Sequence, residues 1–241
     1  MGQAIARCAL QDPTFTIVAA LEASSHPATG RDYGALLGQP TPLGVLVSSD
    51  ARATMKAGEV VIEFTSPQAT EANVRLAQEL RKPMVIGTTG LSMEEQAAIA
   101  AAARTIPIIL SPNMSVGVHV LFEVARWAAE RLGREFDVEV VESHHRQKKD
   151  APSGTAKRLA EVLAASRKQP SDAIPVHAVR AGDIVGDHTV ILAGPSERLE
   201  LTHRAHSREV FARGALRAAR FIVRQPPGLY DMSHVLKNGD V

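Results

Sequence analysis

Short apolar runs alternate with longer amphipathic segments through the first half of the chain. The apolar runs are rich in Val and Ile, and they are FTIVAALE (15–22), GVLVSS (44–49), EVVIEFTS (59–66), KPMVIGTTG (82–90) and IPIILSPN (106–113). Helical patterns such as 67–80 and 92–104 lie between them. Strands that are apolar throughout and separated by helices are typical of a parallel sheet covered on both faces. The pattern therefore predicts a doubly wound α/β domain over residues 1–114.

The pattern of apolar positions changes after residue 113. It becomes a long helical pattern (115–133), a strand (136–143), a helix beginning near Gly154, and alternating residues (176–205) with turns expected at Gly186-Asp187 and Gly194-Pro195. Alternation with closely spaced turn residues predicts antiparallel strands. We therefore expect a second, α+β domain over 115–216. A final helical pattern (208–225) is followed by a short closing element, and we expect residues 217–241 to return to the first domain.

Composition limits the classes of function that the chain can have. The 241 residues are 45% hydrophobic, enough for a sizeable core in one large domain or two smaller ones. The 27 basic and 26 acidic side chains nearly cancel, so no overall field draws the protein to nucleic acid or to a membrane. A single cysteine, Cys8, excludes an internal disulfide and fits a reducing compartment. With no apolar run typical of a signal peptide or a membrane span, we expect a cytoplasmic protein.

An acidic residue stands at the position that a dinucleotide-binding sheet requires. In such a sheet, an acid that ends the second strand, about 20 residues after a glycine turn, binds the adenosine ribose. Glu22 ends the first apolar run and lies twenty positions after Gly2. A solvated loop residue is the alternative, and the α/β alternation makes the two interpretations equally strong.

The chain begins inside what looks like the first helix. A dinucleotide-binding domain is expected to open with a strand and a glycine-rich turn, and here only Met1-Gly2 matches the end of that turn. The first strand and most of the glycine loop are therefore missing from this sequence, as a late start site or a truncation would explain. We expect lowered stability and weakened cofactor binding.

Small residues follow the fourth apolar run. In IGTTG (86–90), Gly87 allows a ligand to approach the backbone, and Thr88 and Thr89 carry hydroxyls that can hydrogen-bond to it. An ordinary strand-to-helix turn explains the same residues, and on this motif alone it is the stronger explanation.

Two adjacent histidines follow the strand of the second domain. His144 and His145 point in opposite directions on an extended strand, so they do not bind one metal ion. Together with the lack of other ligands nearby, this argues against a zinc site, and we expect no bound metal. Farther along, Ser153 is placed to cap a helix whose apolar residues recur at helical spacing from Ala156. The free N–H groups at such a helix start form an anion site.

The same segment joins an anion site to proton donors. A carboxylate bound at Gly154 and Thr155 would lie near Lys148 or His145, either of which can supply a proton. A capped helix preceded by a solvated basic loop is the alternative favoured for an arbitrary run of charge. A nucleic-acid patch ranks last, because the segment holds no aromatic side chain for base stacking.

These residues carry a resemblance to a known family. ESHHRQKKDAPSGTA (142–156) closely resembles the signature segment of bacterial 4-hydroxy-tetrahydrodipicolinate reductases, also called dihydrodipicolinate reductases. Further segments resemble the family in family order, namely EFTSP, VIGTTG, SPNMSVGV, RAGDIVGDHTV, ERLELTHRA and FARGALRAA. The resemblance covers essentially the whole chain, although the region between Ala173 and Arg180 is shorter than in many relatives.

The resemblance implies a fold, a reaction and a set of roles. The first domain would be Rossmann-like and bind NADH or NADPH, while the second would bind substrate and form a homotetramer through its sheets. The reaction would reduce a cyclic imine dicarboxylate, with loss of its hydroxyl as water, in lysine (diaminopimelate) biosynthesis. Lys148 and His144 would be the catalytic residues, and His145, Gly154 and Thr155 would bind substrate. The cofactor residues would be Gly2, Glu22, Gly87, Thr88, Thr89, Ser111, Pro112 and Asn113.

Cofactor choice and the competing functions follow from the same residues. Ala23 follows Glu22 where NADPH-binding relatives often carry a basic residue, which favours NADH or dual use, although Arg31 remains a candidate for a phosphate contact. The alternatives are another two-domain NAD(P)-dependent dehydrogenase and a catalytically inactive binding protein. The segment from Lys148 to Thr155 argues against another dehydrogenase. Titration with nucleotide would distinguish the inactive binding protein from an enzyme.

Overall fold

The computed structural model describes residues 1–237, which form two units. One unit comprises Met1–Met114 together with the chain from Phe211 onward, and the other comprises Ser115–Val210. The return to the first unit lies ahead of the expected residue 217, because one helix, Glu209–Ile222, carries the chain back and packs its buried side there. Residues 238–241 of the expected closing segment lie outside the described residues.

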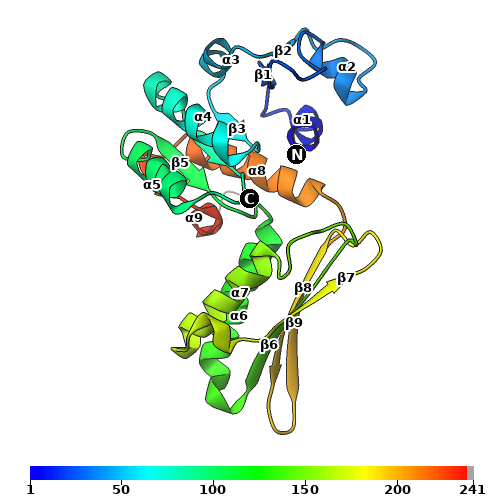
Figure 1. The fold of residues 1–241 in the computed structure, drawn as a ribbon, viewed down its shortest axis with the longest axis vertical. Helices are drawn as coiled ribbons and strands as arrows, with labels where there is room; N and C mark the ends of the chain where they lie inside the picture. Colours follow the sequence, from blue (N-terminus) through cyan, green and yellow to red (C-terminus); the bar gives the residue numbers. More distant parts are fainter. Residues whose placement is uncertain (238–241) are drawn as a thin grey trace. The chain divides into compact units, whose positions relative to one another are not determined.

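The first unit is built on parallel strands separated by helices. Its elements are α1 (Gly2–Leu10), β1 (Ala20–Leu21), α2 (Tyr33–Leu37), β2 (Val47–Ser48), α3 (Ala51–Ala57), β3 (Val61–Glu63), α4 (Pro67–Leu80), β4 (Met84–Ile86), α5 (Met93–Ala102), β5 (Pro107–Leu110), α8 (Glu209–Ile222), β10 (Gly228–Tyr230) and α9 (Met232–Lys237). A four-stranded parallel sheet has the order β10-β5-β4-β3, and β1 and β2 form a separate parallel pair (Figure 1).

Both faces of the larger sheet are covered, as the apolar runs predicted. Met84, Val85 and Ile86 of β4 are all 0% exposed although successive side chains point to opposite faces. Residues of α3, α4 and α5 pack with β4 and β5 in one cluster that includes Met55, Val74, Met84 and Ile99. The predicted doubly wound α/β class is therefore confirmed.

The first apolar run forms less strand than expected. Of residues 15–22, only Ala20 and Leu21 are strand, paired with Val47 and Ser48 of β2. Within residues 1–237 no strand other than β2 pairs with β1. A strand with one short neighbour has few hydrogen bonds to stabilise it, so most of the run is not strand. The first described element is α1, in agreement with the helical interpretation of the opening residues.

The second unit is a four-stranded sheet with helices on one face. Its elements are α6 (Val116–Leu132), a 3-10 turn (Gly133–Glu135), β6 (Asp137–His144), α7 (Gly154–Arg167), a second 3-10 turn (Ser171–Ala173), β7 (Val176–Arg180), β8 (Gly186–Ala193) and β9 (Arg198–Ala205). The strand order is β7-β6-β8-β9. Helices α6 and α7 lie side by side along one face of this sheet in Figure 1, and no helix of residues 115–210 covers the other face.

Two expectations for this sheet are wrong. Strand β7 is parallel to β6 rather than antiparallel, because helix α7 connects them and a crossover of that length returns the chain in the same direction. Gly186-Asp187 is not a turn but the start of β8. An added Cβ at Gly186 would make a tight contact of 3.1 Å with the Nε2 atom of His144. The Gly194-Pro195 turn between β8 and β9 is confirmed.

The buried face of β6 changes from apolar to polar along the strand. Val138 and Val140 are 6% and 0% exposed and join the apolar cluster of this unit, whereas Glu142 and His144 are 0% and 8% exposed. Alternation places all four side chains on the face that α7 covers. The carboxyl end of β6 therefore holds buried groups that need polar partners.

We predict that Gly214→Ala destabilises the first unit. An added Cβ would lie 1.7 Å from the carbonyl oxygen of Met114, so α8 or the segment after β5 must shift. Helix propensity alone would stabilise by about 1 kcal/mol, and overpacking costs about 1 to 3 kcal/mol or more. Urea unfolding measures the net change. Gln68→Ala, at an exposed position of helix α4 in the same unit, is the control, and a Gly214→Ala protein as stable as wild type would contradict the tight contact.

Candidate active site

A buried carboxylate stands at the carboxyl end of β6. Glu142 Oε1 accepts hydrogen bonds from Arg180 Nη2 at 2.8 Å and from the backbone N–H of Ser153 at 3.1 Å. Its Oε2 accepts one from Arg180 Nη1 at 2.8 Å and lies 2.5 Å from His144 Nδ1. The parallel register of β6 and β7 sets Arg180 opposite His144 and so delivers the guanidinium. The carboxylate therefore connects two strands and the start of α7.

These contacts fix the charge states of the pair. Burial alone would raise the pKa of Glu142, but hydrogen bonds from Arg180, His144 and Ser153 outweigh it and the pKa lies below its usual value. Burial lowers the pKa of His144 more than the attraction of Glu142 raises it. At neutral pH the pair is therefore a carboxylate and a neutral imidazole, and the acceptor beside Nδ1 requires the proton on Nδ1.

A second buried histidine, on β8, packs against the same group of residues. His188 is opposite Glu142 in the β6–β8 ladder, and its ring meets that of His144 edge-on with centroids 5.2 Å apart. Its Nε2 lies 3.2 Å from Ser153 Oγ. Burial, its largest cause, lowers the pKa of His188 to about 3, so the ring is neutral.

The start of α7 has the geometry that the sequence predicted. Ser153 is the N-cap, and its Oγ accepts a hydrogen bond from Ala156 N–H at 3.2 Å. Gly154 is exposed, and no atom lies within 4 Å of the place where its Cβ would stand. The helix runs for 14 residues, so its first N–H groups and its dipole favour an anion in front of Gly154 and Thr155.

The loop before α7 carries the expected proton donors. Strand β6 ends at His144, so His145 lies in the following turn, where its carbonyl accepts the N–H of Lys148 at 3.1 Å. The Nδ1 of His145 is buried without a hydrogen-bond partner among the described residues. Lys148 Nζ lies 2.8 Å from Asp150 Oδ1, and this ion pair lowers the pKa of Asp150. In residues 1–237, no group of three or more His, Cys, Asp or Glu side chains is placed to hold a metal ion.

Sequence reasoning missed Glu142, Arg180 and His188. The spacing of Glu142 and His144 puts both on one face of a strand, so an acid there should have indicated a buried partner. No comparable signal identifies Arg180 or His188, because only strand pairing brings them to β6.

In the first unit, the expected cofactor residues after β4 divide into two kinds. Thr88 is buried, and its hydroxyl donates to Glu63 Oε2 at 2.8 Å while accepting from Thr65 N–H at 2.9 Å. Glu63, 3% exposed, also accepts hydrogen bonds from the hydroxyls of Thr65 and Thr70. Thr89 is exposed. The hydroxyl of Thr88 therefore holds the turn together, whereas that of Thr89 faces outward.

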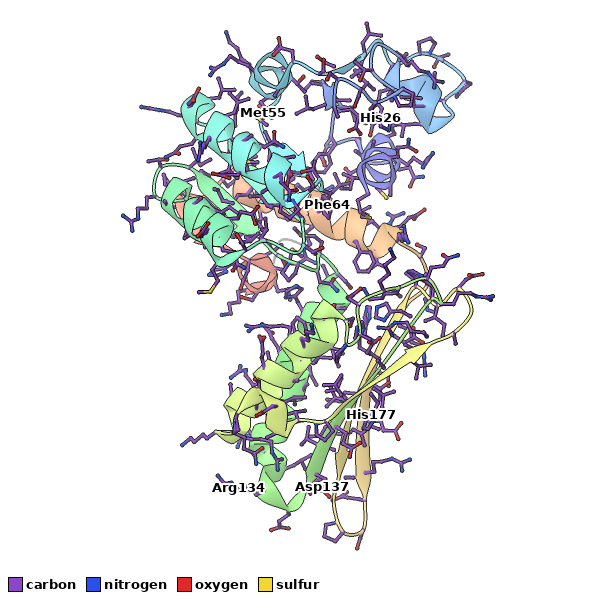
Figure 2. The ribbon with its side chains drawn as sticks, in the orientation of Figure 1. His26, Met55, Phe64, Arg134, Asp137 and His177 are labelled. Carbon is purple, nitrogen blue, oxygen red and sulfur yellow. The ribbon has the colours of Figure 1, made fainter. Side chains whose placement is uncertain are left out.

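Gly87 has a packing reason that the sequence did not show. An added Cβ would lie 2.1 Å from the ring of Phe64, which follows β3 and is labelled in Figure 2. The glycine at this position is thus required by Phe64, and the turn after β4 lies close against the end of β3. Gly90, with φ of 80° and open space around it, is the residue that needs the left-handed conformation.

The turn after β5 lies beside the turn after β4. Ser111 N–H donates to the carbonyl of Ile86 at 3.1 Å, and Ser111 Oγ donates to the carbonyl of Asn113 at 2.7 Å. Pro112 is exposed and Asn113 is half-buried. The structure therefore brings Gly87–Thr89 and Ser111–Asn113 together at the carboxyl edge of the parallel sheet, where such sheets bind ligands.

Gly2 and Glu22 share a neighbourhood with Tyr33. Gly2 opens α1, and the hydroxyl of Tyr33 is 3.8 Å from the place of an added Cβ. Burial raises the pKa of Tyr33, the charge of Arg7 lowers it, and the negative charge of Glu22 raises it further. Glu22 itself is exposed after β1, where its Oε1 accepts the N–H of Ala23 at 2.9 Å. A helix start with an exposed carboxylate nearby fits the phosphate and ribose of a dinucleotide.

Comparison with protein families assigns both halves of the chain. The family model described as dihydrodipicolinate reductase, N-terminus, matches residues 1–114, and the one described as dihydrodipicolinate reductase, C-terminus, matches residues 117–236. None of the helices in residues 1–237 combines the length and apolar character that crossing a membrane requires.

Individual relatives agree with the family models. The chain is 44% identical over 253 aligned positions to 4-hydroxy-tetrahydrodipicolinate reductase of Syntrophus aciditrophicus (strain SB), covering 98% of this chain and 94% of the relative. The reductase of the same name from Anaeromyxobacter sp. (strain Fw109-5) is 49% identical over 253 positions, covering 98% and 93%. Among solved structures, dipicolinate-bound dihydrodipicolinate reductase from Paenisporosarcina sp. TG-14 has a TM-score of 0.77 at 24% identity, covering 95% of this chain and 92% of that one.

We predict that acid destabilises the protein partly through His188. Its folded pKa of about 3 lies below the unfolded value of 6.5, so the unfolded chain binds the extra proton between those pH values. Stability is therefore lost as pH falls through that window, by up to about 1.4 kcal/mol per pH unit from this one group.

Urea unfolding at several pH values, for wild type and His188→Gln, measures this contribution. The variant should show a shallower loss of stability towards low pH, while His206→Gln, which removes an exposed histidine, should not. An unchanged slope in His188→Gln would mean that the buried ring does not resist protonation.

Proposed function

This chain belongs to the dihydrodipicolinate reductase family, and we propose that it reduces 4-hydroxy-tetrahydrodipicolinate to tetrahydrodipicolinate in lysine (diaminopimelate) biosynthesis. The observation that carries the proposal is the segment from Glu142 to Thr155. The start of α7 is joined there to His144 through Glu142, and Arg180 and Asp150 connect Lys148 to the same carboxylate. A dicarboxylate substrate that must gain a proton matches those groups.

The residues of the second unit bind the substrate and supply its proton. The N–H groups at Gly154 and Thr155 hold one carboxylate, and His145 contacts the substrate from the preceding turn. Lys148, held by its ion pair with Asp150, donates the proton, with His144 as its neighbour in the site. In the balanced reaction a hydride and this proton enter, and the hydroxyl leaves as water.

The residues of the first unit bind NADH or NADPH, which supplies the hydride when bound. The N–H groups that begin α1 at Gly2 face a phosphate, and Glu22 accepts hydrogen bonds from the ribose hydroxyls. Gly87, Thr89 and the turn Ser111-Pro112-Asn113 line the nicotinamide at the carboxyl edge of the sheet. Thr88 serves this site indirectly, through its bond to Glu63.

Cofactor preference is set beside Glu22. A carboxylate followed by Ala23 offers no positive charge to a 2′-phosphate and accepts a free 2′-hydroxyl well. Arg31 is exposed and is the remaining basic group in the loop. We therefore assign NADH, or use of both nucleotides, to this chain.

The uncovered face of the second unit's sheet supports assembly into a homotetramer. Within residues 115–210 no helix lies on the face that carries Thr189 and Thr202, whose hydroxyls are 3.0 Å apart. A sheet face without a covering layer is typically buried by another sheet. The enzyme would act in the cytoplasm, in keeping with its single buried thiol, Cys8.

We predict that Lys148→Ala lowers kcat by about 100- to 10,000-fold, because the positioned acid is lost. His145→Ala should act mainly on KM. The assay uses the condensation product of pyruvate and aspartate semialdehyde and follows oxidation of NADH and of NADPH. Arg134→Ala, which removes an exposed cation beyond the other end of β6 (Figure 2), should retain turnover. Wild-type rates in both site variants would refute these roles, and folded wild type without turnover would refute the function.

Substitutions of Thr88 and Thr89 should distinguish a residue that stabilises the turn after β4 from one that binds the nucleotide. Thr88→Val removes a hydroxyl from buried Glu63 and should cost about 1 to 3 kcal/mol of stability. Thr89→Val is exposed and should change stability by less than about 0.5 kcal/mol, yet weaken the binding of both nucleotides. Thermal unfolding and fluorescence titration with NADH and NADPH measure the two effects. Unaltered nucleotide affinity in Thr89→Val would remove Thr89 from the cofactor site.

A further inference from the structure

We propose that Glu142 is a positioning residue for the reductase reaction: its carboxylate holds the ring of His144 and the first turn of the carboxylate-binding helix α7 in one arrangement, with Arg180 as its counterion. The proposal rests on the proposed function, because it concerns the substrate groups assigned there. It adds two residues to the machinery, and it assigns both of them a role through other residues rather than through contact with substrate.

The hydrogen bonds of Glu142 use its whole acceptor capacity. Each oxygen faces two N–H donors, one of them from the guanidinium of Arg180 and the other from Ser153 on Oε1 or His144 on Oε2. A carboxylate accepts at four positions and donates at none, so it matches this set of donors. A glutamine amide in this place would carry an NH2 group instead of one of the two oxygens. In either orientation, that NH2 group would face an N–H of Arg180, and two donors would then point at each other.

Arg180 links the carboxylate to the loop that carries Lys148. Its Nη2 also donates to the carbonyl of Asp150 at 2.5 Å, and Asp150 holds Lys148 Nζ at 2.8 Å. A planar guanidinium donates to both carboxylate oxygens from two nitrogens and has a further N–H for the carbonyl, whereas an ammonium carries all its N–H groups on one nitrogen and lacks this fork. One buried ion pair thus restrains the histidine, the lysine loop and the helix start.

The consequence for His144 is a fixed tautomer. With the proton of Nδ1 directed at Glu142, Nε2 keeps its lone pair, and within residues 1–237 no group hydrogen-bonds to it. The charged and titratable groups that face the ring are Glu142, Lys148, Arg180 from β7 and His188 from β8. The acceptor Nε2 is therefore the nitrogen left for a donor group of the substrate or for water.

A purely structural ion pair would not need this arrangement. Buried ion pairs contribute little net stability, because desolvation offsets their attraction. Two hydrogen bonds already join Arg180 to Glu142. The remaining two acceptor positions of Glu142 face His144 and the N-cap Ser153, which both belong to the candidate site. These two contacts fix the orientation of the His144 ring and the place where α7 begins.

The test compares wild type with Glu142→Gln and Arg180→Lys, and uses Glu161→Gln as the matched control. Glu161 also pairs with an arginine in this unit, but its side chain is 53% exposed. Three properties are measured: turnover with each nucleotide against pH, binding of dipicolinate by calorimetry, and the ring nitrogen resonances of His144. Thermal unfolding establishes that each variant folds.

We expect Glu142→Gln to lower kcat/KM by about 100-fold, to weaken dipicolinate binding, and to move the His144 proton from Nδ1 to Nε2. Arg180→Lys should retain the tautomer and reduce kcat/KM less, since a point charge replaces the fork. Glu161→Gln should match wild type in all three measurements. A stability loss without these changes would mean a structural role only and would overturn the proposal.

Two measurements separate this proposal from the proposed function. Should wild type fold and bind dipicolinate but show no turnover, the function fails, while the tautomer and the affinity change in Glu142→Gln still decide the role of Glu142. Should Glu142→Gln not fold, the wild-type resonances decide, because a wild-type His144 that carries its proton on Nε2 contradicts the proposal. Full turnover in a folded Glu142→Gln protein contradicts it directly.

Discussion

A charge buried away from water must be matched by donors, and in the second unit that constraint falls on Glu142. Its carboxylate is fully buried, and the pairing of β6 with β7 meets it with the guanidinium of Arg180. Because Ser153 donates to the same carboxylate, the start of α7 is fixed relative to β6. The anion-binding helix start, the neutral histidine and the lysine loop all depend on this one group.

The first unit meets a similar requirement by other means. Glu63 is 3% exposed, and the hydrogen-bond donors to it are hydroxyls, those of Thr65, Thr70 and Thr88. Neutral hydroxyl groups donate hydrogen bonds to the buried carboxylate, so no cation has to be removed from water as well. The result is a turn after β4 whose inner side is occupied by protein contacts and whose outer side, at Thr89, is exposed. Thr88 therefore supports the turn, whereas the hydroxyl of Thr89 takes no part in the contacts to Glu63.

Sequence patterns were most reliable where a local rule decides the structure. Helix α4 spans the predicted 67–80, and Ser153 caps α7 as its spacing indicated, because propensity and capping act within a few residues. They were least reliable where strand pairing decides. The direction of β7, the place of Gly186 inside β8 and the shortness of β1 each depend on a neighbour distant in sequence. The sequence likewise gave no sign that the hydroxyl of Thr88 donates to Glu63, which lies 25 positions earlier in the chain.

By itself the sequence determined the class of the fold and the family, and it singled out the segment that we propose binds substrate, because apolar periodicity and short motifs are local properties. Tertiary structure alone decided which groups those residues meet. His144, Arg180 and His188 lie on three different strands, and the ladders of β6 with β7 and β8 bring them to Glu142. Protonation state and ring orientation follow from burial and hydrogen-bond partners, which exist only after those ladders form.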